Sequence, residues 1–102
     1  MNFTDIVDAI EQERARQEEL WNRDHHWGTG DCSSPAVPMI VKAVVLGEEC
    51  GEVMRAVLDL DDDALRTELV QVAAVAVAIL EDRPVALRAD PGERGQHHLA
   101  LT

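Results

Sequence analysis

The chain has 102 residues, of which 46% are hydrophobic and only 3% aromatic, and its formal net charge is −11. This length allows one domain with one modest core, and the hydrophobic content is typical of a globular chain. The acidic balance argues against a duplex nucleic-acid partner, which requires a basic surface. No apolar run reaches the ~20 residues of a membrane span. Two cysteines form no disulfide framework, so we expect a reducing, cytoplasmic location.

The first segment, residues 3 to about 22, has the three-to-four spacing of an amphipathic helix. Its inner face is predicted to hold Phe3, Val7, Ile10, Gln17 and Trp21. The other face is densely charged, and we interpret it as solvated; its members are Glu11, Glu13, Arg14, Arg16, Glu18 and Glu19. Near the helix end, Arg16, Gln17 and Trp21 are candidates for ligand contact. For Trp21, base stacking and a place in the core or an interface both remain open.

The next segment, Asn22 to Pro38, is rich in Gly, Pro and Ser and has no periodicity, which predicts a loop. It is long for a compact helical domain, so a lid or a flexible segment is expected. His25, His26 and Cys32 have no spacing typical of a zinc site, and we assign none.

Two further helices are predicted, from Pro38 to about Leu60 and from about Asp63 to Asp82. Between Leu69 and Leu80 only Gln71 is polar, so the last helix should be central and also lie at a subunit interface. Residues 1–87 are therefore predicted to form one all-α domain, a helical bundle completed by homo-oligomerisation into a dimer or tetramer. Residues 88–102 are predicted to be a tail.

Glutamates three residues apart are the central feature of the two later helices. Glu49 and Glu52 would share one helix face among apolar residues, where unpaired and repelling charges are costly. Glu68 and Gln71 repeat the spacing on the following helix. Facing helices that each offer two oxygen ligands would form a cage for Mg²⁺ or Mn²⁺.

The stretch LGEECGEV, followed from Glu68 by ELVQVAAVAVAIL, resembles the MazG-like all-α nucleoside triphosphate pyrophosphohydrolases. That family carries EExxE on one helix and ExxD on the next, and its phage-type members have a first helix similar to ERARQEELW. The resemblance covers roughly residues 3–82. It implies metal ligation by Glu49, Glu52 and Glu68, with Glu48 as the additional Glu that opens the motif. Gln71 stands where the family has Asp, which removes one negative charge from the metal site.

The resemblance also implies a reaction, the hydrolysis of a nucleoside triphosphate to the monophosphate and pyrophosphate by attack of water at the α-phosphorus. Glu48 or Glu52 would orient or deprotonate that water. Lys42 and Arg55 are candidates for phosphate contact, with an ordinary surface salt bridge as the alternative for each. The base would lie near Gln17 and Trp21.

Two other functions compete with this reading. The first is a catalytically weak or silent helical dimer that binds nucleotides or a protein partner, which Gln71 favours. The second is a purely structural acidic bundle, which must place carboxylates on an apolar face without a cation.

Overall fold

Three helices make up most of the computed structural model, which describes residues 1–82. They are α1 (Phe3–Trp21), α2 (Met39–Leu58) and α3 (Asp62–Glu81), as expected of an all-α chain. The connection between α1 and α2 holds a small antiparallel hairpin of β1 (Asp24–His25) and β2 (Gly28–Thr29). The predicted tail at 88–102, and the end of the predicted domain at residue 87, lie outside the described residues.

Short polar residues begin α1 and α3. The Asn2 side chain accepts a hydrogen bond from the backbone of Asp5 at 2.8 Å, while Asp5 accepts one from the backbone of Asn2, which forms a capping box. Asp61 caps α3 by accepting from the backbone of Ala64 at 2.9 Å. The aspartate-rich segment between α2 and α3 therefore ends one helix and begins the next.

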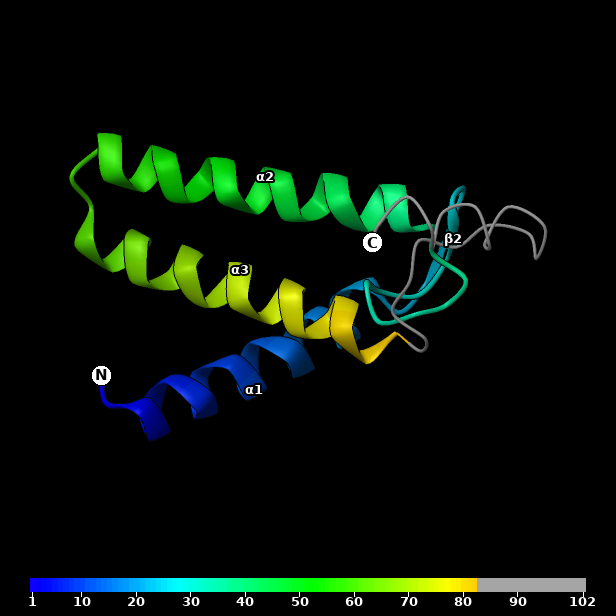
Figure 1. Cartoon of the computed structure of the whole chain (residues 1–102), viewed down its shortest axis with the longest axis horizontal. Helices are drawn as coiled ribbons and strands as arrows, with labels where there is room; N and C mark the ends of the chain where they lie inside the picture. Colours follow the sequence, from blue (N-terminus) through cyan, green and yellow to red (C-terminus); the bar gives the residue numbers. More distant parts are fainter. Residues whose placement is uncertain (83–102) are drawn as a thin grey trace, which may run out of the picture.

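A tight turn reverses the chain between α2 and α3. Leu60 has a φ of +53°, in the left-handed region, and its N–H donates to the carbonyl of Val57. The N–H of Asp61 donates to the carbonyl of Ala56, which completes a Schellman ending for α2. The reversal lays α2 and α3 side by side (Figure 1). Glu49 and Glu52 of α2 thereby come close to Glu68 of α3.

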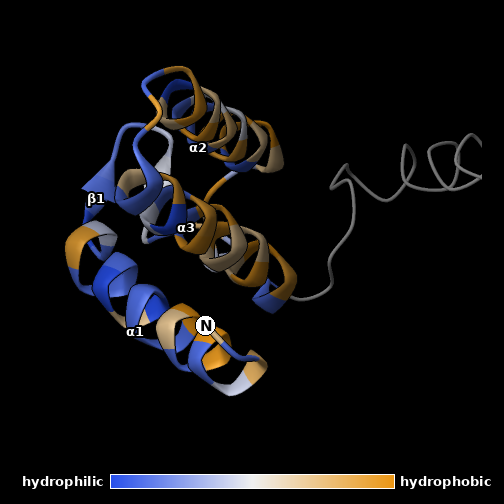
Figure 2. Ribbon diagram, turned by 90° about the vertical axis from the view of Figure 1, so that its left-hand side faces the viewer, coloured by the Kyte–Doolittle hydropathy of each residue, from blue (hydrophilic) through white to orange (hydrophobic). Residues whose placement is uncertain are grey.

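The third helix lies between the other two, as predicted from its apolar run. It packs against α2 on one side and against α1 on the other (Figure 1). The buried apolar side chains are small or branched: Val37, Ala56, Ala74, Val75 and Ala78. Colouring by hydropathy shows that α2 and α3 carry most of the apolar residues, whereas α1 is mainly hydrophilic (Figure 2). None of the helices in residues 1–82 is long and apolar enough to cross a membrane.

The predicted orientation of α1 is wrong for two of its charged residues. Arg14 was expected in solvent, but it is buried and its guanidinium contacts Glu81 at 2.7 Å and Asp31 at 3.0 Å. The Glu13 side chain is only 11% exposed. Conversely Phe3, expected on the inner face, is 79% exposed. Burial of the guanidinium is tolerated because the end of α3 and the loop supply carboxylates to it.

A second buried ion pair joins the start of α2 to the end of α3. Lys42 is 0% exposed, and its ammonium donates to Oδ2 of Asp82, which is itself 2% exposed. Two charges without access to water need such a pairing, because the loss of hydration is otherwise uncompensated. The pair therefore fixes the ends of these two helices against each other.

The loop between α1 and α2 folds back on itself. Gly28 has a φ of +139°, and a Cβ at this position would lie 2.1 Å from the carbonyl oxygen of Ala36. Only glycine therefore permits this close approach. The Thr29 hydroxyl donates to Asp24 at 2.7 Å and the Ser34 hydroxyl donates to the carbonyl of Thr29 at 2.6 Å. These contacts hold the hairpin against residues 34–36 of the same loop.

Candidate metal and ligand site

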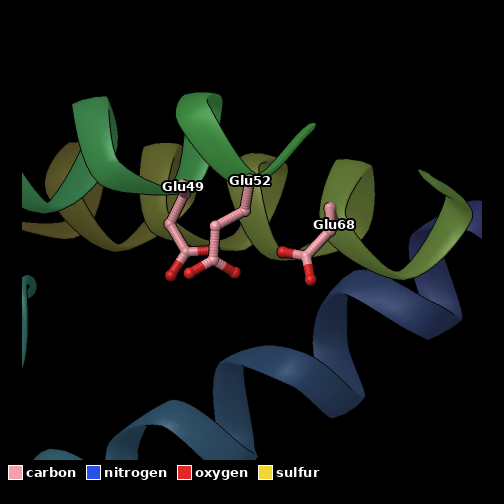
Figure 3. A group of neighbouring side chains, drawn as sticks. All are labelled: Glu49, Glu52 and Glu68. Atoms are coloured by element: carbon pink, nitrogen blue, oxygen red, sulfur yellow. The ribbon is translucent and has the colours of Figure 1, made fainter. Parts of the chain in front are cut away.

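Three glutamate carboxylates from two helices meet on one side of the molecule. Glu49 and Glu52 lie one turn apart on α2, and Glu68 faces them from α3 (Figure 3). One oxygen from each lies within 4.8 Å of the others. Two oxygens on opposite sides of Mg²⁺ are about 4 Å apart, so small side-chain movements would bring these three into ligating distance. All are hard oxygen donors, which suits Mg²⁺ or Mn²⁺.

The three carboxylates repel one another in the absence of a cation. Partial burial, followed by the negative charges of Glu52 and Glu68, raises the pKa of Glu49. The pKa of Glu68 is raised by desolvation, then by its hydrogen bond with Glu52 and the charge of that residue. A bound divalent cation would reverse both effects, since it favours the ionised carboxylates. The donor set therefore fits the predicted ion.

Gln71 borders the same group of carboxylates. With its amide nitrogen turned toward them, Gln71 donates to Oε2 of Glu68 at 2.8 Å and to Oε2 of Glu49 at 3.2 Å. With its amide oxygen turned toward them, it faces only acceptors. The first orientation relieves repulsion without a metal, and the second would be stabilised by a cation between the oxygens. Gln71 is therefore positioned as either a neutralising donor or a fourth ligand.

An apolar pocket of about 120 Å³ opens beside Glu49. The predicted ligand residues Arg16, Gln17 and Trp21 line it from α1, and Glu48 and Glu49 line it from α2. This volume is below the ~300 Å³ of the smallest ordinary ligand pockets, so it would hold one part of a ligand, such as a ring system.

Aromatic rings from the loop extend this pocket. Trp27 lines it together with Trp21, and His25 lies between the two indoles, stacked on Trp27 at a centroid distance of 4.9 Å. The Nε2 atom of His25 lies 3.2 Å from the carbonyl oxygen of Trp21. The half-exposed Trp21 therefore lies against the His25 ring at the pocket wall instead of in the core.

A second, more polar pocket follows the first along α2. Glu48 lines both pockets, while Glu52, Arg55 and Glu68 line only the second. Arg55 is exposed and is the only basic side chain lining this second pocket among the described residues. The carboxylate group thus lies between an aromatic pocket toward the start of α2 and a polar pocket toward its end.

The structure separates Lys42 from the other predicted ligand residues. Lys42 was predicted to contact phosphate, and its position in the structure contradicts that prediction. Its ammonium is buried and already pairs with Asp82. The two-turn spacing to Glu49 put it correctly on the inner face of α2. That face is covered by α3 at the level of Lys42, which the spacing alone does not reveal.

Two residues of the site were not predicted. Glu13 carries a fourth negative charge that helps to raise the pKa of Glu49 and Glu68. It accepts hydrogen bonds from Arg16 at 2.6 and 2.8 Å and from Gln17 at 3.1 Å, and the Arg16 contact lowers its own pKa. Glu13 lies four residues before Gln17, on the same face of α1, and this spacing could have indicated that it belongs to the site. Trp27 lies in the aperiodic loop, where no pattern indicated it.

Comparison of the chain with protein-family models, with curated proteins and with solved structures gives no match.

Proposed function

We propose that this protein is a metal-dependent nucleoside triphosphate pyrophosphohydrolase of the MazG-like type. The observation that carries the proposal is the meeting of Glu49, Glu52 and Glu68 within 4.8 Å, with Gln71 against two of them. A group of like charges at a half-buried place, with raised carboxyl pKa values, calls for a cation. These are also the positions at which the resemblance implies ligands. The proposal includes a cytoplasmic location and a homodimer or homotetramer.

The pocket order along α2 suggests how a nucleotide would lie. The base would occupy the aromatic pocket beside Trp21 and Trp27, since indoles stack well on any base. The α-phosphate would then lie over the glutamates, and the β- and γ-phosphates would reach the polar pocket and Arg55. Arg16, held by Glu13 at the edge of the first pocket, would contact the phosphates from the α1 side.

The reaction would be attack of water on the α-phosphorus, with rupture of its bond to the oxygen that bridges to the β-phosphorus. Glu49, Glu52, Glu68 and Gln71 would hold the cation, which would neutralise charge at the phosphate oxygens and lower the pKa of water. Glu48 is exposed and lines both pockets, so its carboxylate can accept the proton that the attacking water loses. Glu52 is the other candidate for this base. Pyrophosphate and the nucleoside monophosphate are the products.

A release assay tests this function directly. With Mg²⁺ or Mn²⁺ present, we expect pyrophosphate from at least one canonical or damaged nucleoside triphosphate and none after chelation. Mg²⁺ should also stabilise the folded protein and so raise its melting temperature. At a free Mg²⁺ concentration of one hundred times the dissociation constant, the added stability is about 2.7 kcal/mol. Stabilisation by nucleotide together with absence of turnover over the full panel would indicate the alternative, a silent nucleotide-binding dimer. If the protein is neither stabilised by metal or nucleotide nor active on any nucleotide, it is a structural bundle.

Gln71→Asp is the sharpest test of the fourth ligand. If the amide oxygen of Gln71 ligates the cation, an ionised carboxylate should bind Mg²⁺ more tightly. Turnover should rise as well if metal loading limits the parent protein. If Gln71 acts only as a donor to Glu49 and Glu68, Asp adds a fifth negative charge beside Glu13 and the three glutamates, and stability should fall by a few kcal/mol.

Calorimetric titration of Mg²⁺ and a melting curve separate these two outcomes for Gln71. Tighter binding with recovery of the melting temperature at saturating Mg²⁺ supports ligation. A melting temperature that Mg²⁺ does not restore would reject it. Gln71→Glu is the matched control, since it adds the same charge on a side chain of unchanged length.

A further inference from the structure

One polar side chain in the wall of the aromatic pocket has an open hydrogen-bond acceptor. Gln17 is only 9% exposed, and it lines this pocket but neither of two neighbouring pockets along α1. Its amide nitrogen donates to Oε2 of Glu13 at 3.1 Å. Its amide oxygen accepts no hydrogen bond from the described residues, in which every buried side-chain oxygen has a partner. The amide oxygen is therefore not buried, and it opens onto the aromatic pocket.

Glu13 fixes the amide of Gln17 in this orientation. An ionised carboxylate only accepts hydrogen bonds, so the amide nitrogen must face it. Arg16 donates to both oxygens of Glu13, at 2.8 and 2.6 Å, and these hydrogen bonds lower the pKa of Glu13. Glu13 is therefore ionised at neutral pH, and a reversed amide would set two acceptors against each other. The oxygen of Gln17 is thus held as an acceptor at the pocket wall.

The other side chains of the pocket wall offer acceptors more than donors. Three carboxylates line the pocket: Asp31, Glu48 and Glu49. Arg16 is the one cation that residues 1–82 contribute to this lining, and it already pairs with Glu13. The indoles of Trp21 and Trp27 donate only in the plane of the ring, so an indole stacked on a base cannot reach the edge of that base. The thiol of Cys32 is a weak donor. A ligand edge that meets this wall should therefore carry donors.

We propose that the aromatic pocket selects nucleobases with an exocyclic amino group, and that Gln17 is the residue that selects them. The inference rests on the proposed function, which places the base beside Trp21 and Trp27. Cytosine and adenine carry an amino donor where uracil and hypoxanthine carry a carbonyl acceptor. The amino group can donate to the oxygen of Gln17, whereas a carbonyl would face that oxygen with a second acceptor. The preferred substrates are then the triphosphates of amino-bearing bases.

The size of the preference follows from the burial of Gln17. Stacking on an indole is nearly equal for two bases of the same ring size, so it does not distinguish cytosine from uracil. The hydrogen bond does distinguish them, because an acceptor that loses its water and gains no donor is left unpaired. We expect the carbonyl base to bind at least ~10-fold more weakly than its amino counterpart.

Titration of the full chain with nucleosides tests the selection without phosphate, metal or turnover. The chain has two tryptophans and both line the aromatic pocket, so their indole N–H signals in a proton–nitrogen correlation spectrum report binding there. Cytidine is compared with uridine, and adenosine with inosine, since each pair exchanges an amino group for a carbonyl on the same ring. Cytidine and adenosine should shift both signals and bind at least ~10-fold more tightly than their counterparts.

Two substitutions test the residues themselves. Gln17→Leu keeps the bulk of the side chain and removes the acceptor, so the preference should fall below ~3-fold while both indole signals still shift. Glu13→Gln keeps Gln17 but frees its amide to reverse, so the preference should fall in this variant too. Gln12→Leu is the matched control, because Gln12 is an exposed glutamine of α1 that lines a different pocket. The control should retain the full preference, and the same spectra show that each variant is folded.

The outcomes separate this inference from the proposed function. Equal binding of cytidine and uridine, or an unchanged preference in Gln17→Leu, would overturn the selection even if pyrophosphate is released from nucleotides. Nucleosides that shift neither indole signal at up to about 10 mM would overturn both the selection and the aromatic pocket as the base site. The expected preference together with no turnover of any triphosphate would support the selection and reject the hydrolase. If Gln17→Leu does not fold, the nucleoside pairs on the parent chain and on Glu13→Gln decide.

Discussion

Replacing Glu49 or Glu68 with glutamine is expected to abolish metal-dependent pyrophosphate release, with a loss of at least ~100-fold. Residues that only support a metal ligand already contribute 10- to 100-fold, and these two would be ligands themselves. The helices should remain intact, because each substitution preserves the size of the side chain and removes only its charge. Turnover at the parent rate in either variant would exclude the proposed cage.

The same two variants should be more stable than the parent when no metal is present. Partial burial, followed by repulsion from neighbouring carboxylates, raises the pKa of both glutamates above the ordinary 4.5. The folded, metal-free protein therefore binds more protons than the unfolded chain above pH 4.5, and its stability falls as the pH rises through the raised pKa values. Glutamine carries no charge at any pH, so a variant with glutamine at either position loses less stability as the pH rises.

Melting curves with and without Mg²⁺ test this expectation, because the order of stability of parent and variants should change when the metal binds. In EDTA the variants should melt above the parent at neutral pH, and in saturating Mg²⁺ they should melt below it, since only the parent gains ligand stabilisation. Glu11→Gln is the matched control, because Glu11 is an exposed glutamate of α1 that no part of the site contacts in residues 1–82. It should leave both curves unchanged.

Lys42→Met is expected to destabilise the fold by about 3–5 kcal/mol, the usual result of removing one partner from a buried ion pair. The Lys42 ammonium pairs with the buried Asp82 across the ends of α2 and α3. A loss of this size is a large part of the 5–15 kcal/mol that holds an ordinary domain together. The melting temperature should therefore fall by more than ~10 °C.

This substitution also distinguishes the structural role of Lys42 from the phosphate contact suggested by its spacing. A phosphate ligand would change substrate affinity and leave the denaturation midpoint near that of the parent. If Lys42 instead forms a structural ion pair, Lys42→Met should lower the denaturation midpoint in urea. The KM of the protein that remains folded should then be unchanged. Arg55→Met, which removes a charge from an exposed position on the same helix, should alter stability by less than ~0.5 kcal/mol.

The local features of this protein could be predicted from its sequence. The bounds of the three helices agree with the predicted ones within two residues. The three-residue spacing also put Glu49 and Glu52 on one face of α2, opposite Glu68. These features follow from backbone geometry and near-neighbour hydrogen bonds, which act over one or two helix turns.

The tertiary structure decided which polar side chains are buried and what they contact. Arg14 meets Glu81 across 67 residues of sequence, and Lys42 meets Asp82 across 40. Helix periodicity assigns a charged residue to a face, but the energy that allows its burial comes from a partner on another element. Glu13, which the sequence put in solvent, differs from these two, because its hydrogen-bond partners Arg16 and Gln17 lie on its own helix. What the tertiary structure decided for Glu13 is its place close enough to α2 and α3 to raise the pKa of Glu49 and of Glu68.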